Sequence, residues 1–233
     1  MYAVIFDVDD TLYDMAAPFF EAYASFFAPK YDIPAEKLYP ISRKYSNAAY
    51  PQALSGQISM REVYLSRICD AFGEFGVKIS EQEALDFQEL YSSLQHKISL
   101  SETMQKLLEY CSSRARLGII TNGMPAIQWG KINSLQVERY IPREYIFVSR
   151  EVGAEKPDPH IFRYAQQKMG LSDQDTIFYV GDSYDCDVAG AHAAGWKSIW
   201  MNRRSRIKPA GAPEPDYTVE SETELAHILK VLV

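Results

Sequence analysis

The chain begins with an apolar run that leads into a cluster of carboxylates, Ala3-Val4-Ile5-Phe6-Asp7-Val8-Asp9-Asp10-Thr11. The apolar run has the length and the β-branched content of a buried strand. Residues two apart on an extended chain point the same way, so Asp7 and Asp9 emerge together where this strand ends. Two carboxylates at such a short distance repel each other, so the site requires either a cation or a shared proton. An acidic cluster in this place is also typical of a solvated turn or a helix N-cap, so this stretch alone does not distinguish a functional site from these two alternatives.

Further apolar runs of strand length come in the second half of the chain. They are Leu117–Ile120, Tyr145–Val148, Thr176–Val180, Ser198–Met201 and Tyr217–Val219. Helical patterns alternate with them, at Pro125–Leu135, Pro159–Met169, Val188–Ala194 and Glu222–Leu232. Such alternation is the signature of βαβ units and of a parallel sheet. We therefore predict an α/β fold with a doubly wound parallel sheet.

The region 16–100 is different, because it shows almost no strand signal. Aromatic residues recur there at helical spacing, as in Phe19, Phe20, Tyr23 and Phe27, which predicts an all-helical insertion of about four helices. We expect an α/β core domain of residues 1–15 and 101–233, and a helical cap domain of residues 16–100. Ligands of open α/β sheets bind beyond the carboxyl ends of the strands, so an insertion directly after the first strand is placed to act as a lid.

Composition and charge narrow the classes of function. The 233 residues carry a net charge of -7, which argues against nucleic acid as the main partner, because such proteins need a basic surface. No apolar stretch approaches the roughly 20 residues of a membrane span, and the first residues lack the basic region of a signal peptide. The odd number of cysteines shows no metal-ligand spacing, which favours reduced thiols in a cytoplasmic protein. Those cysteines are Cys69, Cys111 and Cys186.

Two segments offer groups that suit a phosphate. Thr121 and Asn122 directly follow the run Leu117–Ile120 and present a hydroxyl and an amide, although a capped turn before a helix would look the same. Lys156 stands before Pro157, and a following proline disfavours helical backbone at the lysine. The lysine is therefore held at the mouth of a helix, where its compact charge can neutralise both a phosphate and a nucleophile.

A last acidic segment follows the run Thr176–Val180. Asp182 and Asp187 bracket a tight turn into the next helix. Carboxylate oxygens at strand ends are the ligands that Mg²⁺ prefers, although solvation or helix capping would explain an acidic loop by itself. Each of these segments has an ordinary alternative, but each also follows its own predicted strand. Their joint appearance in this order indicates a single site for phosphoryl transfer.

These motifs together resemble the haloacid dehalogenase-like hydrolase superfamily. The matching motifs are Asp7-x-Asp9-x-Thr11, Thr121-Asn122-Gly123, Lys156-Pro157 and Gly181-Asp182-Ser183-x-x-x-Asp187. The resemblance covers almost the whole chain and rests on a specific set of motifs. It implies a Rossmann-like parallel sheet, and the helical insertion resembles the type of mobile cap that lies between the first and second motifs.

The resemblance also implies a role for each matching residue. Asp7 resembles the nucleophile that forms an aspartyl phosphate, and Asp9 resembles the general acid/base. Thr121 and Lys156 resemble the pair that orients the phosphate, with Asn122 beside them. The implied cofactor is Mg²⁺. Its implied ligands are Asp7, the backbone carbonyl of Asp9, Asp182 and, directly or through water, Asp187.

Position 9 separates the reactions of this superfamily. Dehalogenases resemble Asp-x-Tyr there and phosphonate-cleaving members Asp-x-Ala, whereas Asp9 suits an alcohol leaving group. The expected function is therefore a Mg²⁺-dependent phosphatase that hydrolyses a small phosphorylated metabolite, such as a nucleoside monophosphate or a sugar phosphate. A phosphomutase and a non-catalytic binding relative stay open as alternatives, and a monomer and a homodimer are not distinguished.

Specificity is expected in the helical insertion, where the sequence is least informative. Arg43, Lys44 or Arg67 could pair with a second anionic group of the substrate, although solvated cations are the simpler interpretation. A basic loop follows the run Ser198–Met201, and we expect it to be solvated. Its members are Arg203, Arg204, Arg206 and Lys208.

Overall fold

The computed structural model describes residues 1–233, except for the side chain of Leu54. It divides into two compact units, which are described separately: an α/β unit of Met1–Asp14 with Ile98–Val233, and a helical unit of Met15–Lys97. The domain boundaries expected from the sequence, after residues 15 and 100, fall one and three residues beyond these.

None of the described helices has both the length and the apolar character that crossing a membrane requires.

The described residues of the α/β unit form a six-stranded sheet in the order β3-β2-β1-β4-β5-β6, and every neighbouring pair is parallel. The strands are β1 (Tyr2–Phe6), β2 (Arg116–Thr121), β3 (Ile146–Val148), β4 (Thr176–Gly181), β5 (Lys197–Met201) and β6 (Tyr217–Val219). The chain winds outward from β1 to β3, returns to place β4 beside β1, and then winds the other way. The predicted doubly wound parallel sheet is confirmed, and its strand order reverses between β1 and β4.

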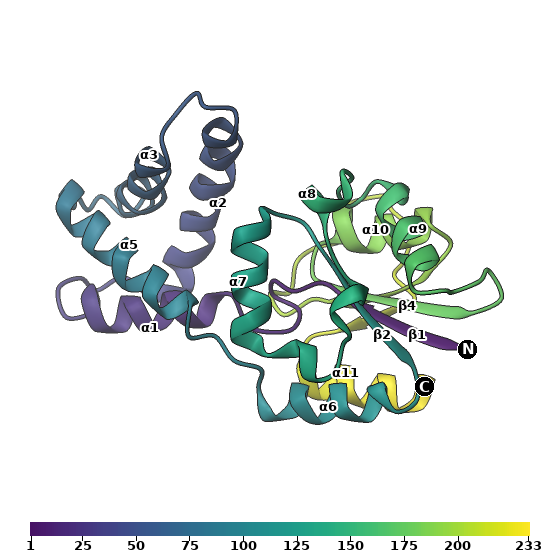
Figure 1. Ribbon diagram of the computed structural model, residues 1–233. Coiled ribbons are helices and arrows are strands. Elements are labelled where there is room, and N and C mark those ends of the chain that lie inside the picture. Colours follow the sequence, from purple (N-terminus) through teal and green to yellow (C-terminus); the bar gives the residue numbers. More distant parts are fainter. The chain divides into compact units, whose positions relative to one another are not determined.

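Helices cover both faces of this sheet (Figure 1). The longer helices are α6 (Glu102–Ser112), α7 (Pro125–Leu135), α9 (Pro159–Lys168) and α11 (Glu222–Leu232). Shorter turns are η2 (Val137–Arg139), η3 (Arg143–Tyr145), α8 (Ser149–Val152), the π-helical η4 (Tyr184–Val188) and α10 (Ala189–Ala193). In the figure α6 and α11 lie side by side on one face, and α9 and α10 lie on the other.

The strands of this unit could be predicted from the sequence because helices cover both faces of the sheet. The central strands β1 and β4 are buried along nearly their whole length, as parallel strands between helices must be, so each appears as a continuous apolar run. The helices begin at side-chain caps. Ser101, Asp158 and Ser221 each accept a hydrogen bond from a backbone N–H of the first turn of α6, α9 and α11. The predicted strand and helix ranges differ from the observed ones by at most one residue at either end.

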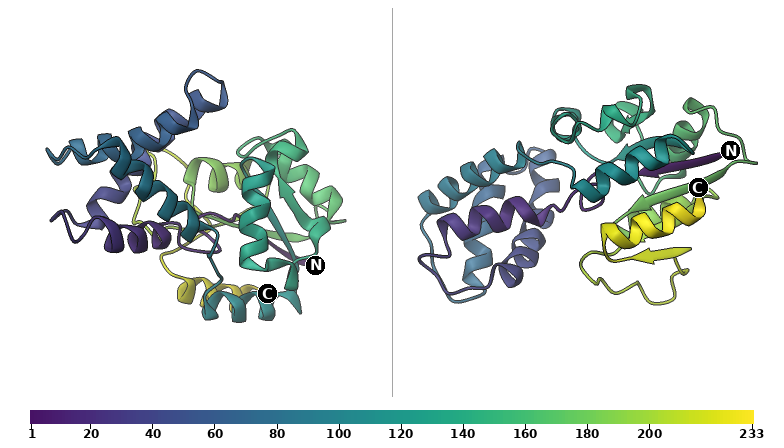
Figure 2. Two further views of the ribbon diagram at one scale, coloured as in Figure 1. Left: turned by 60° about the vertical axis from the view of Figure 1, so that its left-hand side comes forward. Right: turned by 90° about the horizontal axis from the view of Figure 1, so that it is seen from below.

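The helical unit contains no strand among its described residues, as Figure 2 also shows. Its elements are α1 (Ala16–Phe26), α2 (Ala35–Leu54), α3 (Met60–Leu65), the π-helical η1 (Ser66–Asp70), α4 (Ala71–Gly73) and α5 (Glu81–Gln95). Capping boxes start two of them. Ser59 exchanges hydrogen bonds with Glu62 at the start of α3, and Ser80 does the same with Glu83 at the start of α5.

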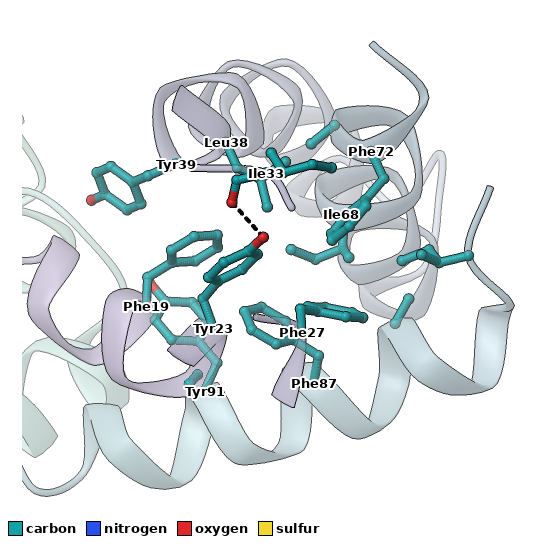
Figure 3. Packing of buried hydrophobic residues seen from close by; sticks show 14 of the residues in the cluster. Phe19, Tyr23, Phe27, Ile33, Leu38, Tyr39, Ile68, Phe72, Phe87 and Tyr91 are labelled. Atoms are coloured by element: carbon teal, nitrogen blue, oxygen red, sulfur yellow. Dashed lines mark hydrogen bonds between the residues drawn. The ribbon is translucent and has the colours of Figure 1, made fainter. Parts of the chain in front are cut away.

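Aromatic side chains fill the core of the helical unit (Figure 3). Phe27 lies at the centre, with its ring centroid 4.7 Å from that of Phe72 and 4.9 Å from that of Phe87. Tyr23 is also buried and donates its hydroxyl to the backbone oxygen of Ile33 at 2.6 Å. Tilted and edge-on rings at such distances stabilise a core beyond the area they bury. The aromatic stripe seen in the sequence is therefore core packing.

Candidate active site

The predicted carboxylates meet where the strand order of the sheet reverses. Asp7 follows β1, and its backbone N–H donates to the carbonyl of Val180 on β4 at 2.8 Å. Asp182 directly follows the last residue of β4. Because β1 and β4 are adjacent and parallel, their carboxyl ends bring these two residues to the same edge. This is the edge at which open α/β sheets bind their ligands.

A buried lysine ties the carboxylates together. Nζ of Lys156 lies 2.6 Å from Oδ1 of Asp7, 2.7 Å from Oδ1 of Asp187 and 2.9 Å from the hydroxyl of Tyr179. The lysine is only 4% exposed. Burial opposes its charge, but Asp187 and Asp7 hold the pKa of the ammonium well above its usual range. The predicted nucleophile, the predicted phosphate-orienting lysine and the supporting carboxylate therefore form one network.

Asn122 fixes the backbone of this lysine. Its Nδ2 donates to the carbonyl of Lys156 at 2.8 Å, and its Oδ1 accepts from the N–H of Lys156 at 2.9 Å. Both ends of the amide are thus engaged by one residue. Thr121, just before it, is buried and accepts a hydrogen bond from Nε2 of Gln128. The structure therefore brings both residues to the site, with Asn122 bound to Lys156.

Asp9 has a separate set of partners. Nζ of Lys131 lies 2.8 and 2.6 Å from its two carboxylate oxygens, and the hydroxyl of Tyr13 donates to Oδ1 at 2.6 Å. Burial alone would raise the pKa of Asp9, but the Lys131 ammonium together with these hydrogen bonds lowers it below its ordinary value. Gln128 also contacts Asp9, at 3.4 Å, and accepts from Lys131 at 2.9 Å. The Asp9 carboxylate is ionised and held toward α7.

Four residues of this site were not identified from the sequence. Gln128 and Lys131 lie three apart on α7 and so share one helix face, but many pairs of residues on a helix do so, and this spacing alone did not indicate them. Tyr13 is four residues beyond Asp9, and nothing in the sequence marked it. Tyr179 lies inside an apolar strand, where its hydroxyl donates to the carbonyl of Ile120 at 2.8 Å. A tyrosine in such an apolar run is ordinarily interpreted as a residue that packs in the core.

Three carboxylates lie close enough to one another to hold a metal ion. Oxygens of Asp7, Asp182 and Asp187 all lie within 4.8 Å of one another. Burial raises the pKa of Asp7 to about 8 against the pull of Lys156, and the charges of Asp187 and Asp182 raise it further. Burial also raises the pKa of Asp182 to about 6, with Asp187 adding to the effect. Clustered oxygen donors with more negative than positive charge fit a hard divalent cation such as Mg²⁺.

The expectation that the basic loop after β5 is solvated was wrong for Arg203 and Arg204, which are half-buried, and the exposed Arg206 also forms ion pairs. Nη1 of Arg206 lies 2.6 Å from Oδ2 of Asp182, and its Nη2 lies 3.6 Å from Asp10. Arg204 pairs with Asp10 and Asp14. Arg203 donates to the backbone oxygens of Asp10 and Thr11, each at 3.0 Å. These arginines fold back because the carboxylates after β1 and β4 outnumber the cations near them in sequence.

A glycine makes room for Asp187. An added Cβ at Gly181 would lie 2.3 Å from both Cγ and Oδ2 of Asp187, a distance that no real contact allows. We expect Gly181→Ala to displace that carboxylate and to lower kcat by about 100-fold, since misplacing a reacting group by about 1 Å has that order of effect. Gly130→Ala on α7 is the matched control, because open space surrounds its Cβ. Steady-state kinetics of both variants test this, and equal rates would contradict it.

The raised carboxyl pKa values predict how stability depends on pH without metal. A carboxyl whose pKa is higher in the folded protein stabilises the fold at low pH, and this contribution is lost as pH rises through the folded pKa. For Asp182 and Asp7 the loss runs through about 6 and about 8. We expect the melting temperature in EDTA to fall from pH 5 to pH 9 and Mg²⁺ to raise it more at pH 8 than at pH 5. Asp182→Asn should flatten the profile, and a wild-type profile that rises over this range would contradict the prediction.

Comparison with known proteins gives relatives along the whole chain. Residues 4–201 match the family of haloacid dehalogenase-like hydrolases. The chain is 35% identical over 123 residues to the pyrimidine 5'-nucleotidase YjjG of Escherichia coli, an alignment covering 53% of each protein. It is 32% identical over 138 residues to the N-acylneuraminate-9-phosphatase of Homo sapiens, covering 59% of this chain and 54% of that one. The chain therefore spans about half the length of these two relatives.

Other relatives align from end to end. An alignment of 251 residues with the glyceraldehyde 3-phosphate phosphatase of Methanopyrus kandleri shows 24% identity and covers 99% of this chain and 97% of that one. Among solved structures, the HAD-hydrolase YfnB of Bacillus subtilis bound to magnesium has a TM-score of 0.68 at 22% identity, covering 98% of both chains. The L-2-haloacid dehalogenase of Xanthobacter autotrophicus has a TM-score of 0.67 at 16% identity, covering 99% of both. These structures share the fold.

Proposed function

Because this chain belongs to the haloacid dehalogenase-like hydrolase family, we propose that it is a phosphatase that hydrolyses a small phosphorylated metabolite and carries the phosphoryl group on Asp7. The observation behind this is the buried ammonium of Lys156 between Asp7 and Asp187, at the edge where the strand order reverses. The relatives named as phosphatases and as a nucleotidase support the reaction class. The substrate itself is left open by their differing names.

In the first step the phosphoryl group moves to Asp7. An oxygen of Asp7 attacks phosphorus as the bond to the leaving oxygen breaks, and Asp9 gives a proton to that oxygen so that the alcohol leaves neutral. The charge of Lys156 stabilises the phosphoryl oxygens, and Thr121 orients them. Because Lys131 keeps the free Asp9 ionised, Asp9 acts as an acid only after its carboxylate has left Lys131 and taken up a proton.

In the second step water releases the phosphate. Asp9 is now ionised and accepts a proton from the water as the water oxygen attacks phosphorus. The bond between phosphorus and Asp7 breaks, which frees inorganic phosphate and restores the carboxylate. A divalent cation held by Asp7, Asp182 and Asp187 would supply further positive charge to the phosphate oxygens. In this assignment Asn122 holds Lys156 in place, and the helical unit acts as a cap that excludes bulk water.

Asp9 favours a phosphatase over a dehalogenase. Loss of a halide ion needs no proton donor, whereas an alkoxide is a poor leaving group that must be protonated. The second carboxylate of the Asp7-x-Asp9 pair, only partly exposed and carried on the loop after β1, supplies that donor. The dehalogenases among the solved relatives share the fold with this chain at identities under 25%, so they do not decide the reaction.

A leaving-group comparison tests the role of Asp9. Wild type and Asp9→Asn are assayed with Mg²⁺ on a panel of alkyl phosphates, including nucleoside monophosphates and sugar phosphates, and on p-nitrophenyl phosphate. We expect Asp9→Asn to slow alkyl phosphates by about 10²- to 10⁴-fold, the usual contribution of a general acid. The loss on p-nitrophenyl phosphate should be much smaller, because nitrophenolate leaves without a proton.

The exposed Asp185 gives the matched control, and Asp185→Asn should behave like the wild type on both classes of substrate. If Asp9→Asn slowed both classes equally, the acid role would be wrong. If the wild-type protein released phosphate from none of the panel and none from p-nitrophenyl phosphate, the phosphatase proposal would be overturned.

A further inference from the structure

Arg67 is a partly buried arginine of the helical unit whose hydrogen-bond acceptors are all neutral. It lies in η1, the wider turn between α3 and α4. Such π-helical turns are frequent at functional sites. Nη1 of Arg67 donates to Oε1 of Gln88 at 3.1 Å, and Nη2 donates to Oγ of Ser46 at 2.8 Å. Its Nε is buried without a partner. Two of the five guanidinium donors are therefore used, both on uncharged groups.

Three exposed cations of the same unit have different surroundings. Lys30, Lys44 and Arg61 are exposed, and each forms an ion pair with a glutamate. Across the part of the chain that the structure describes, no carboxylate forms an ion pair with Arg67. Burial lowers the pKa of its guanidinium, and the charge of Arg43 adds to this effect. Arg67 thus lacks a carboxylate counter-ion among the residues that the structure describes.

Aromatic rings orient the guanidinium. Its central carbon lies 5.6 Å from the ring centroid of Tyr91 and 6.0 Å from that of Tyr64. Cation–π contacts at these distances hold the group in place without neutralising its charge. Gln88 and Ser46 are themselves buried, so their side chains are fixed as well. A preorganised guanidinium loses little entropy when it binds a ligand.

The physical cost of this arrangement indicates an anion. A partly desolvated cation without a counter-ion costs free energy, and a neutral residue could hold α2 and α5 to η1 at lower cost. The guanidinium fork matches the two oxygens of a carboxylate or a phosphate group. We propose that Arg67 is an anion-binding residue of the helical unit and that its ligand is the carboxylate or phosphate group of a small metabolite. If that metabolite is the substrate, which rests on the proposed phosphatase function, the substrate carries a second anionic group.

The first experiment compares two substrates that differ in one charge. Wild type, Arg67→Met and Arg67→Lys are assayed on 3-phosphoglycerate, which has a carboxylate, and on glycerol 3-phosphate, which has none. A charged hydrogen bond corresponds to about 10- to 100-fold in affinity. For a substrate ligand we expect Arg67→Met to lower kcat/KM on 3-phosphoglycerate by that factor through KM and to leave glycerol 3-phosphate within about threefold. Arg67→Lys should recover part of the loss. Arg61→Met, which removes an exposed and paired cation of the same unit, is the control.

The second experiment separates a substrate from an independent effector and needs no turnover. Thermal melting of wild type and the Arg67 variants is followed with added succinate and with inorganic phosphate. An effector would raise the melting temperature of wild type and Arg67→Lys but not of Arg67→Met, with no change in selectivity between the two substrates. The inference is overturned if Arg67→Met and Arg67→Lys lose activity equally on both substrates and no anion shifts the melting temperature in an Arg67-dependent way. Inactivity of the wild type on all phosphates would overturn the phosphatase function, while the melting experiment would still decide the anion site.

Discussion

Replacing Asp7 with asparagine is expected to lower phosphate release by about 10⁴-fold or more while the protein stays folded. Residues that act as a catalytic unit show losses of this size when the nucleophile is removed. Asparagine has the same shape as aspartate but cannot form the acyl phosphate. Lys156 keeps its second carboxylate partner, Asp187, at 2.7 Å, so no buried charge is left unpaired.

The stability of the same variant provides a second readout. Burial and neighbouring carboxylates raise the pKa of Asp7 to about 8, which means that its charged form costs stability when no metal is bound. At pH 8 in EDTA the Asp7→Asn protein should therefore melt at the same temperature as the wild type or higher. Rates are measured as phosphate release with Mg²⁺, and Asp185→Asn serves as the control. Residual activity within about tenfold of wild type would mean that another group attacks phosphorus.

The sheet and its carboxylates could be predicted because the same physical constraint acts on both. A strand covered on both faces must be apolar throughout, so a polar residue appears only where the strand ends. In β1 this boundary falls between Phe6 and Asp7, and in β4 it falls after Gly181. The sequence therefore marks the edge of the sheet and the candidate catalytic carboxylates with one signal.

The partners of these carboxylates lie far away in sequence, and nothing local indicates them. Lys131 is a lysine on a helix of ordinary appearance, 122 residues from Asp9. Arg204 and Arg206 lie in a loop that looks solvated, and they reach Asp10 and Asp182 only because β5 runs beside β4. A surface cation and a site cation have the same sequence signature, and the fold decides between them. The excess of carboxylates over nearby cations in the acidic motifs is the one feature of the sequence that indicates a need for cations from elsewhere in the chain.

A lysine-to-methionine change at position 156 is expected to have the largest effect on stability. The change leaves Asp7 and Asp187 buried beside each other without their shared cation, and breaking a buried ion pair in this way costs about 3 to 5 kcal/mol. Both side chains are almost fully buried, so solvent screening does little to reduce this cost. We expect the melting temperature to fall by roughly 10 °C and kcat to fall by about 10²- to 10³-fold, as for the loss of one group that stabilises transition-state charge. Lys168→Met removes an exposed lysine and is the control in both measurements.

The cause of that instability can be isolated with a second substitution. If the cost comes from two facing carboxylates, then neutralising one of them should recover part of it. The double variant Lys156→Met/Asp187→Asn should therefore be more stable than Lys156→Met alone, although each single change removes a hydrogen-bond partner from the other. The coupling between positions 156 and 187, measured by urea unfolding of the four proteins in EDTA, should be about 1 to 3 kcal/mol. Additive losses would instead show that Lys156 stabilises the fold through the packing of its methylene groups. In that case the charge of Lys156 would contribute to catalysis and not to the stability of the fold. The double variant should then keep the loss in kcat and recover no stability.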